Sequence, residues 1–299
     1  KFFFIPLNNF NQADLIKGVN NVGCKNLSEA IKIINNEIDI KSIIYACKNN
    51  LLLKRRFESD KSKYNFDFSE VKGQIKAKRA IEIAVSGMHN IMLIGPPGSG
   101  KTMIAQRIVT IMPELSLSES IEVSKIHSLG DGLECSLSRL RPFRNPHHTI
   151  SRVSLIGGGL TPKPGEISLA HRGVLFLDEF HQFPKFLIED LRQPLENKYI
   201  TISRNNLFCV FPCSFMLVIA TNPCYCGYNG DSKKKCICSL KEIEKYWSNI
   251  SGPIMDRIDM RIRIPRINEE AFIIDKNSEP SLSIRNRIIK AHKIQSNRY

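Results

Sequence analysis

The segment that most constrains how this chain can fold is residues 95–102, which read Gly-Pro-Pro-Gly-Ser-Gly-Lys-Thr. A short apolar run at 90–94 precedes it, as expected for a buried parallel strand, and residues 103–109 follow with helical spacing. A glycine-rich turn between a strand and a helix is the setting of a phosphate-binding loop. The sequence therefore predicts an α/β fold of the P-loop NTPase type that binds a nucleoside triphosphate, with a chance glycine-rich turn as the alternative.

Every residue of this loop is a candidate for contact with the nucleotide. The glycines allow the backbone to turn tightly, so that its N–H groups and the helix N-terminus can face the phosphates. Lys101 would add a positive charge there, and the hydroxyl of Thr102 can hold Mg²⁺. The predicted nucleotide-binding residues are Gly95, Pro96, Pro97, Gly98, Ser99, Gly100, Lys101 and Thr102.

Two acidic residues downstream complete the predicted site. Residues 174–177 are apolar and are followed by Asp178 and Glu179, so a buried strand would deliver two carboxylates at its C-terminal tip. In this arrangement Asp178 binds Mg²⁺ through water, and Glu179 polarises the water that attacks the γ-phosphate. Because the pair follows a phosphate-binding loop, we expect hydrolysis rather than nucleotide binding alone.

Asn222 ends another apolar run, residues 215–221. At the tip of a strand beside that of Asp178, its side chain could hydrogen-bond the γ-phosphate or the lytic water. Before Pro223, however, an asparagine is also an ordinary turn residue. The residues alone leave both interpretations open.

The nine cysteines fall into two groups. Five are scattered and are expected to be inert, namely Cys24, Cys47, Cys135, Cys209 and Cys213. The other four form two C-x-C pairs, Cys224 with Cys226 and Cys236 with Cys238. Four thiolates so grouped could hold a structural Zn²⁺, although C-x-C is tighter than the usual C-x₂-C spacing. Free thiols in a surface loop are the alternative.

The formal net charge of +14 suits an anionic partner such as nucleic acid. The excess is spread along the chain, so charge alone does not establish such binding. No apolar run reaches the length of a membrane span, no leader is visible, and many cysteines without a leader indicate reduced thiols. We expect a cytoplasmic protein without a membrane partner. Because the chain starts at Lys1 with a strand-like segment, we also expect a fragment or an incomplete N-terminus.

The pattern along the chain predicts four parts: 1–47, a polar linker at 48–65, a nucleotide domain at 66–265, and 266–299. Helical spacing is found at 11–17, 27–35 and 75–88, and Asn26 or Ser28 could cap the second of these helices. A β-hairpin is expected over 198–208, turning at Asn205-Asn206. Residues 281–299 are predicted to form a basic helix whose partner surface lies outside the chain.

His147 and His148 stand together in an unusual block between the two halves of the site. Adjacent histidine side chains point apart on most backbones, and no carboxylate accompanies them. We therefore expect structural or partner contacts here rather than a metal site.

Several segments occur in an order that carries a family resemblance: 67–74, 95–102, 141–149, 164–171, 175–179, 192–196, 222–224 and 251–259. Together they resemble the magnesium-chelatase-like AAA+ ATPases of the ComM/YifB type, over nearly the whole chain. The block at 141–149 is far more specific than the phosphate-binding loop. The resemblance implies an AAA+ fold, preceded at 1–47 by the end of a small α+β Lon-protease-like domain that is not expected to be proteolytic.

The resemblance also implies a ring, with a hexamer expected, that holds ATP between subunits. Arg257 matches the family's arginine finger, which reaches the γ-phosphate of the neighbouring subunit, although on its own it would be taken for a surface or ion-paired arginine. Asn222 matches the sensor position, and Gly73 and Gln74 match the stretch that contacts adenine. ComM-type proteins are associated with DNA branch migration in natural transformation, so a helicase of competence is implied, with residues 157–159 and the hairpin as candidate pore elements.

The chain departs from the family pattern in two places. Tyr225 replaces the second proline of the usual Asn-Pro-Cys-Pro-Cys-Gly, and the chain stops at Tyr299, before the helical lid. A chain that ends there is expected to bind ATP weakly and hydrolyse it poorly. Two alternatives remain: a magnesium-chelatase motor subunit that acts through partner subunits, and a regulatory or assembly module that ATP switches without turnover.

Overall fold

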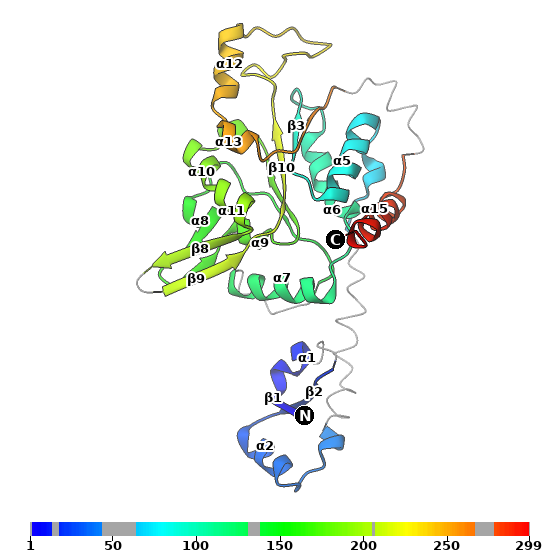
Figure 1. The fold of residues 1–299 in the computed structure, drawn as a ribbon, viewed down its shortest axis with the longest axis vertical. Helices are drawn as coiled ribbons and strands as arrows, with labels where there is room; N and C mark the ends of the chain where they lie inside the picture. Colours follow the sequence, from blue (N-terminus) through cyan, green and yellow to red (C-terminus); the bar gives the residue numbers. More distant parts are fainter. Residues whose placement is uncertain are drawn as a thin grey trace. The chain divides into compact units, whose positions relative to one another are not determined.

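The computed structural model describes residues 2–13, 18–43, 64–130, 138–204, 207–266 and 278–298, which form two compact units (Figure 1). The first unit holds the described residues before 44, and the second begins at Tyr64. The predicted linker lies outside the described residues except for its last two positions.

In the first unit, β1 (Phe2–Pro6) pairs in parallel with β2 (Asn20–Cys24). The short elements η1 (Leu7–Asn9) and α1 (Phe10–Ala13) lie between the two strands in the sequence, and α2 (Leu27–Ile34) follows β2. Of the two predicted caps for α2, Asn26 serves, because its side chain accepts a hydrogen bond from the Glu29 N–H at 2.9 Å. The strand expected at 2–5 is confirmed, while most of the helix expected at 11–17 lies outside the described residues. The Lon-like origin of this unit stays a prediction.

The second unit is built on a five-stranded, fully parallel sheet in the order β11-β3-β10-β7-β4. Its strands are β3 (Ile91–Ile94), β4 (Phe143–Arg144), β7 (Val174–Leu177), β10 (Met216–Thr221) and β11 (Met260–Arg263). Parallel strands need crossover connections, and helices supply them here. The α/β P-loop fold predicted from the sequence is therefore confirmed.

The central strands are buried on both faces, which explains why they are continuous apolar runs rather than alternating ones. Successive side chains of a strand point to opposite faces. Along β7, Val174 and Phe176 therefore join one core cluster, while Leu175 and Leu177 join the other. The sheet therefore has one hydrophobic core on each face.

Helices cover both faces of the sheet (Figure 1). On one face lie α5 (Ile75–Gly87), α6 (Lys101–Ile111) and α15 (Ser281–Ser296). The core of the other face draws on α8 (Arg152–Ile156), α9 (Glu166–Leu169), α10 (Lys185–Asp190), α11 (Arg192–Asn197) and α13 (Gly252–Met255). The remaining elements are η2 (Phe68–Glu70), α7 (Leu117–Gly130), η3 (Phe180–Gln182), α12 (Leu240–Ser248), the pair β5 (Gly157–Gly158) with β6 (Lys163–Pro164), and the hairpin β8 (Tyr199–Arg204) with β9 (Leu207–Pro212).

Three expectations, two about helices and one about a hairpin, meet different outcomes. The helix expected at 75–88 is confirmed as α5, and the hairpin at 198–208 is confirmed, although its predicted turn at 205–206 lies outside the described residues. The expectation that the C-terminal helix has its partner surface outside the chain is wrong. Ile284 and Ile288 of α15 are buried in the core that α5 and α6 also build (Figure 1). Its many basic residues concealed this apolar face.

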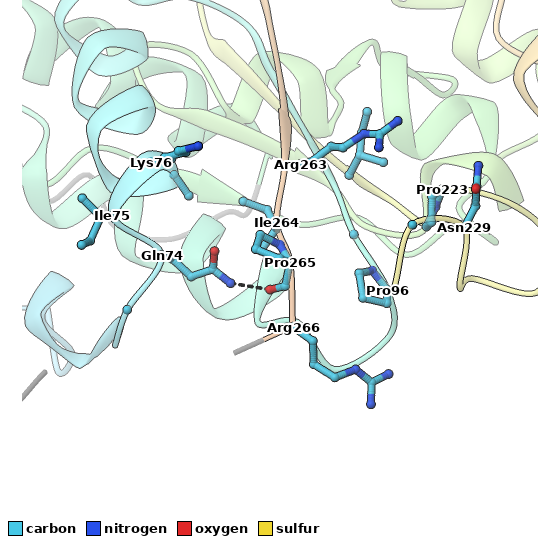
Figure 2. A pocket seen from close by; sticks show the side chains of 15 residues that line it. Gln74, Ile75, Lys76, Pro96, Pro223, Asn229, Arg263, Ile264, Pro265 and Arg266 are labelled. Carbon is cyan, nitrogen blue, oxygen red and sulfur yellow. Dashed lines mark hydrogen bonds between the residues drawn. The ribbon is translucent and has the colours of Figure 1, made fainter. Parts of the chain in front are cut away.

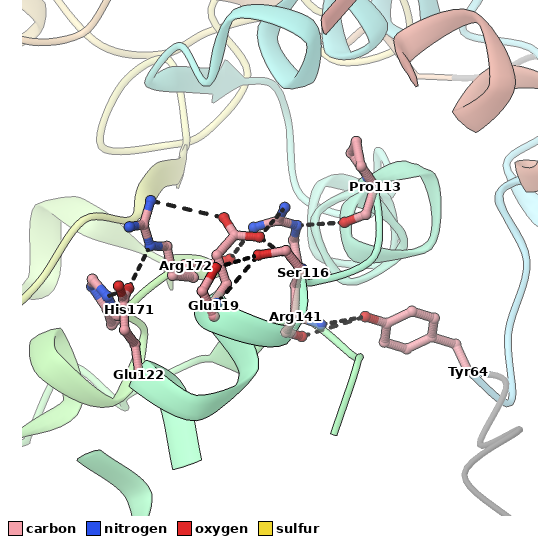
Figure 3. Close-up of polar contacts among 9 residues, drawn as sticks. Tyr64, Pro113, Ser116, Glu119, Glu122, Arg141, His171 and Arg172 are labelled. Atoms are coloured by element: carbon pink, nitrogen blue, oxygen red, sulfur yellow. Dashed lines mark hydrogen bonds and ion pairs between the residues drawn. The ribbon is translucent and has the colours of Figure 1, made fainter. Parts of the chain in front are cut away.

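A polar network ties α7 to the start of β4 and β7 (Figure 3). Arg141 donates to the carbonyls of Pro113 at 2.5 Å and Arg172 at 2.7 Å, and lies 3.7 Å from a carboxylate oxygen of Glu119. His171 accepts the Ser214 N–H at its Nδ1 and contacts a carboxylate oxygen of Glu122 through Nε2 at 3.2 Å. The acceptor role of Nδ1 requires a neutral ring with its proton on Nε2.

None of the described helices is both long and apolar enough to cross a membrane.

Candidate functional site

The phosphate-binding loop joins β3 to α6 at the C-terminal edge of the sheet. Gly98 and Gly100 have φ of 75° and 85°, a region that residues with a Cβ rarely adopt. Gly95 is required by close approach, because a Cβ there would lie 2.3 Å from the Ile264 carbonyl oxygen. The loop therefore has the tight, backbone-lined turn that the sequence predicts for phosphate binding.

Lys101 begins α6 and points back into this loop. Its Nζ donates to the carbonyl oxygens of Gly95 at 2.7 Å and Pro96 at 2.9 Å. Burial lowers the pKa of Lys101, and the charges of Asp178 and Glu179 oppose that shift. The ammonium group is thus a desolvated cation whose partners are weak neutral carbonyls, which suits it to exchange them for phosphate oxygens.

Thr102 and Asp178 come together although they lie far apart in the sequence. The Thr102 hydroxyl donates to a carboxylate oxygen of Asp178 at 2.6 Å. Glu179, the next residue, has φ of 49° and caps η3, so the backbone turns sharply after β7. A hydroxyl and a carboxylate in contact beside a phosphate-binding loop are oxygen ligands of the kind Mg²⁺ prefers.

Asn222 follows β10, which lies between β3 and β7 in the sheet. The strand order therefore puts its side chain between the phosphate-binding loop and the acidic pair. Its Oδ1 lies 3.3 Å from Nζ of Lys101 and accepts a hydrogen bond from it. The residues alone leave a turn residue and a sensor open, and the sensor role of Asn222 stays a prediction.

A cavity of about 630 Å³ opens beside the loop and includes Gly73 and Gln74 in its lining (Figure 2). The Gln74 side chain donates to the Pro265 carbonyl at 2.6 Å, which closes one wall. Burial of α5 against the sheet brings Ile75 to the same wall. The position of the predicted adenine-contacting stretch is thus next to the phosphate-binding loop.

Two segments that the sequence did not mark also line the cavity. They are the end of β11 with the residues after it, and the tip of the loop that carries the cysteines. Arg263, Pro265 and Arg266 line the cavity, together with Asn229 and Gly230 (Figure 2). Arg266 donates to the Pro97 carbonyl at 3.4 Å. No motif marks these residues, because only the pairing of β11 with β3 carries them to the site.

The paired histidines differ from the expectation that their side chains point apart. The rings of His147 and His148 lie 4.0 Å apart between centroids, and the His148 Nδ1 is 4.0 Å from a carboxylate oxygen of Glu179. The expectation that no carboxylate accompanies them is therefore also wrong. His148 and Glu179 are neighbours in the fold although they lie far apart in the sequence, so the sequence alone did not reveal the contact.

The four clustered cysteines do converge. Their sulfur atoms all lie within 4.8 Å of one another, and this is the single group of potential metal ligands found among the described residues. The Cys224 Sγ is 3.4 Å from that of Cys226 and 3.7 Å from that of Cys236. The cluster can hold a metal ion.

Arg257 lies away from the phosphate-binding loop of its own chain. Its guanidinium donates to a carboxylate oxygen of Glu196 at 2.6 Å, and its carbonyl accepts from the Asn90 side chain at 2.8 Å. Asn90 immediately precedes β3, whereas the loop follows that strand. The ion pair agrees with the interpretation of Arg257 from its residue type alone, and its role as an arginine finger stays a prediction.

Taken together, the donors fit a nucleoside triphosphate with Mg²⁺. Backbone N–H groups at the start of α6 and a buried lysine suit phosphate oxygens. The Ser99 hydroxyl is buried without a hydrogen-bond partner among the described residues, so the loop also has a free polar group to offer. Lys101, Thr102 and Asp178 supply the positive charge and the oxygen ligands.

Comparison with known proteins identifies the family of the chain. The family model of magnesium chelatase, subunit ChlI, matches residues 67–272. Over 297 residues the chain is 37% identical to competence protein ComM of Haemophilus influenzae, covering 98% of this chain and 57% of that protein. Over 237 residues it is 41% identical to the uncharacterized protein YifB of Escherichia coli, covering 78% of this chain and 46% of YifB. The chain thus spans about half the length of the curated relatives it matches.

A cryo-EM structure of the complex between subunits BchI and BchD of magnesium chelatase also aligns, with a TM-score of 0.48 and 19% identity over 76% of this chain and 75% of that one. The family model covers most of the second unit, from η2 beyond β11. The chain therefore belongs to the magnesium chelatase ChlI family of AAA+ proteins, in the ComM/YifB type that its sequence resembles.

Proposed function

We propose that this chain is part of an ATP-hydrolysing AAA+ motor that acts on DNA as a cytoplasmic hexamer. One observation carries the hydrolytic part: the Thr102 hydroxyl and the Asp178 carboxylate meet at 2.6 Å beside the phosphate-binding loop, with Glu179 next in the chain. A protein that only bound nucleotide would not need this second carboxylate.

In this proposal each polar residue has a distinct task. Lys101 leaves the carbonyls of Gly95 and Pro96 and binds the β- and γ-phosphates. Thr102 and Asp178 hold Mg²⁺, which neutralises charge that develops on the phosphates. Glu179 orients the attacking water and takes its proton. Asn222, already within hydrogen-bond distance of Lys101, contacts the γ-phosphate.

Arg257 acts on the site of the neighbouring subunit. Its hydrogen bond to Asn90, the residue before β3, puts it at the opposite end of that strand from the phosphate-binding loop, which supports a composite site between subunits. A heterologous interface of this kind closes into a ring when the rotation between subunits permits. Six subunits is the number that the family resemblance implies.

DNA is the proposed substrate because three features favour a polyanion. The formal charge is +14, and a relative with 37% identity is named as a competence protein. In addition, the two candidate pore elements are adjacent: a Cβ on Gly157 would lie 2.7 Å from Ile202 of the hairpin. Phe208 of the hairpin is 70% exposed, and an exposed aromatic side chain can stack on bases. Leu160, the residue after Gly159, is 85% exposed. We propose branch migration in natural transformation as the biological role.

Zn²⁺ is the metal that we propose for the cysteine cluster, since four thiolates are a donor set that it prefers.

A second candidate function rests on the family match itself, whose description is that of a magnesium chelatase subunit. There the same motor would act through partner subunits rather than on DNA.

Steady-state ATP hydrolysis, measured with and without single-stranded and branched DNA, tests the proposal on the full-length protein. We expect stimulation by DNA that is lost in Lys101→Ala and Glu179→Gln but kept in Lys245→Ala, an exposed lysine of α12. Hydrolysis that ignores DNA would favour the chelatase-type motor. ATP binding without hydrolysis would favour an ATP-switched assembly module.

A further inference from the structure

The cysteine cluster is placed directly after Asn222, so its structure bears on the nucleotide site. Cys224 is two residues beyond Asn222, and it is buried, while the other three sulfurs belong to partly exposed residues. Between Asn222 and the start of α12 at Leu240, the described chain forms no helix or strand. A segment of this length without regular structure depends on other links to keep its shape.

The sulfur positions match the requirement of one tetrahedral ion. With Zn–S bonds of about 2.3 Å, sulfurs at the corners of a tetrahedron lie about 3.8 Å apart. The Sγ–Sγ distances are 3.4 Å for Cys224 and Cys226, 3.5 Å for Cys226 and Cys236, and 3.7 Å for Cys224 and Cys236. They are far longer than a disulfide bond of about 2.05 Å. The cluster is therefore shaped to take an ion and not to form a covalent link.

The loop held by the cluster touches the phosphate-binding loop at several points. A Cβ on Gly227 would lie 2.9 Å from Cδ of Pro97, so the backbone at Gly227 packs closely against the proline ring. Asp231 is 3.3 Å from the guanidinium of Arg266, which in turn donates to the Pro97 carbonyl. Pro223, Asn229 and Gly230 form part of the lining of the nucleotide cavity.

We infer that Zn²⁺ bound by Cys224, Cys226, Cys236 and Cys238 controls nucleotide affinity, because it shapes the loop that forms one wall of the cavity and sets the position of Asn222. This inference rests on the proposed function, since it requires the cavity to bind ATP. Metal loss or thiol oxidation would release the loop from Pro97 and Arg266 and weaken ATP binding. Because coupling between two sites is reciprocal, bound ATP would also slow the release of Zn²⁺.

The single tryptophan of the chain is a built-in reporter of this loop. The Trp247 indole N–H donates to the Pro223 carbonyl at 3.2 Å, one residue before the first cysteine of the cluster. A loop that rearranges on metal loss would break or lengthen this bond, and the indole fluorescence would change. The readout does not depend on activity.

The experiment compares the zinc-loaded protein with protein stripped by a chelator under reducing conditions. We expect one zinc per chain by elemental analysis, a change in Trp247 fluorescence on stripping, and ATP affinity weaker by about 5- to 150-fold, restored by added Zn²⁺. Zinc release to a colorimetric chelator should be slower with ATP present. Cys24→Ser, in the first unit and outside the cluster, should behave as wild type in these assays, whereas Cys236→Ser should resemble the stripped protein.

Two outcomes separate the inference from the proposed function. If the loaded protein binds ATP and the stripped protein binds it equally well, the inference is wrong while the motor proposal stands. If the loaded protein binds no ATP, the proposed function itself fails. A protein that neither contains nor takes up Zn²⁺ also overturns the inference. Should Cys236→Ser not fold, Asp231→Asn remains: it keeps all four thiols but loses the ion pair with Arg266, so stripping should then change ATP affinity less than in wild type.

Discussion

Replacement of Arg257 by alanine tests the shared active site most directly. The Arg257 carbonyl is hydrogen-bonded to the Asn90 side chain at 2.8 Å, and the Met260 N–H donates to the Asn90 carbonyl at 3.1 Å. Arg257 is thus anchored where β3 begins. From Asn90 to Gly95, five extended residues span about 16 Å, which is beyond the reach of an arginine side chain. Arg257 cannot stabilise a γ-phosphate bound by its own chain.

The expected effects follow from the action of Arg257 on a neighbouring subunit. An arginine finger that acts from a neighbour contributes about 10³- to 10⁵-fold to turnover, so Arg257→Ala should lose hydrolysis to that extent while ATP binding persists. Glu179→Gln should also be inactive alone. In a ring formed from an equal mixture of the two variants, about one interface in four pairs an intact Glu179 with an intact Arg257, so about a quarter of the wild-type rate should return.

The assay is steady-state phosphate release from each variant and from mixtures co-assembled at different ratios. Arg261→Ala is the matched control, since Arg261 lies nearby and donates to the Met255 carbonyl. The reasoning is refuted if Arg257→Ala hydrolyses ATP at the wild-type rate. It is also refuted if mixed rings, shown to contain both variants, stay as inactive as either variant alone.

Three further outcomes are expected. Ile288→Ala should lower the free energy of unfolding, measured in urea, by about 2–5 kcal/mol. Ile294 lies on the same helix but is 56% exposed, so Ile294→Ala should lower it by less than about 0.5 kcal/mol. Equal effects would mean that α15 is not packed on the core. Asp178→Asn should remove the Mg²⁺ dependence of nucleotide binding in a magnesium titration, while Asp256→Asn keeps it. Burial lowers the pKa of His171 from its ordinary 6.5, so the folded protein favours the neutral ring. Stability should be full above pH 6.5 and fall as the pH drops below it, less so in His171→Gln, in unfolding series at several pH values.

Much of the candidate site could be predicted because its signals are local. The phosphate-binding loop needs its glycines within eight residues, and the strand that ends at Asp178 is a continuous apolar run because both its faces are buried. Such patterns depend on the conformation of the chain near each residue. The strand-turn-helix unit, α5 and the hairpin were predictable for that reason.

The tertiary structure decided which distant residues meet. Asn222 lies between the phosphate-binding loop and Asp178 because the order of the strands puts β10 between β3 and β7. Likewise, Arg266 reaches the cavity only because β11 pairs with β3, and α15 packs on the core through apolar positions hidden among basic ones. These contacts join residues far apart in the chain, and a linear pattern carries no information about pairing partners. The sequence by itself determined that this chain has a phosphate-binding loop on an α/β fold, and the packing of the sheet determined what surrounds that loop.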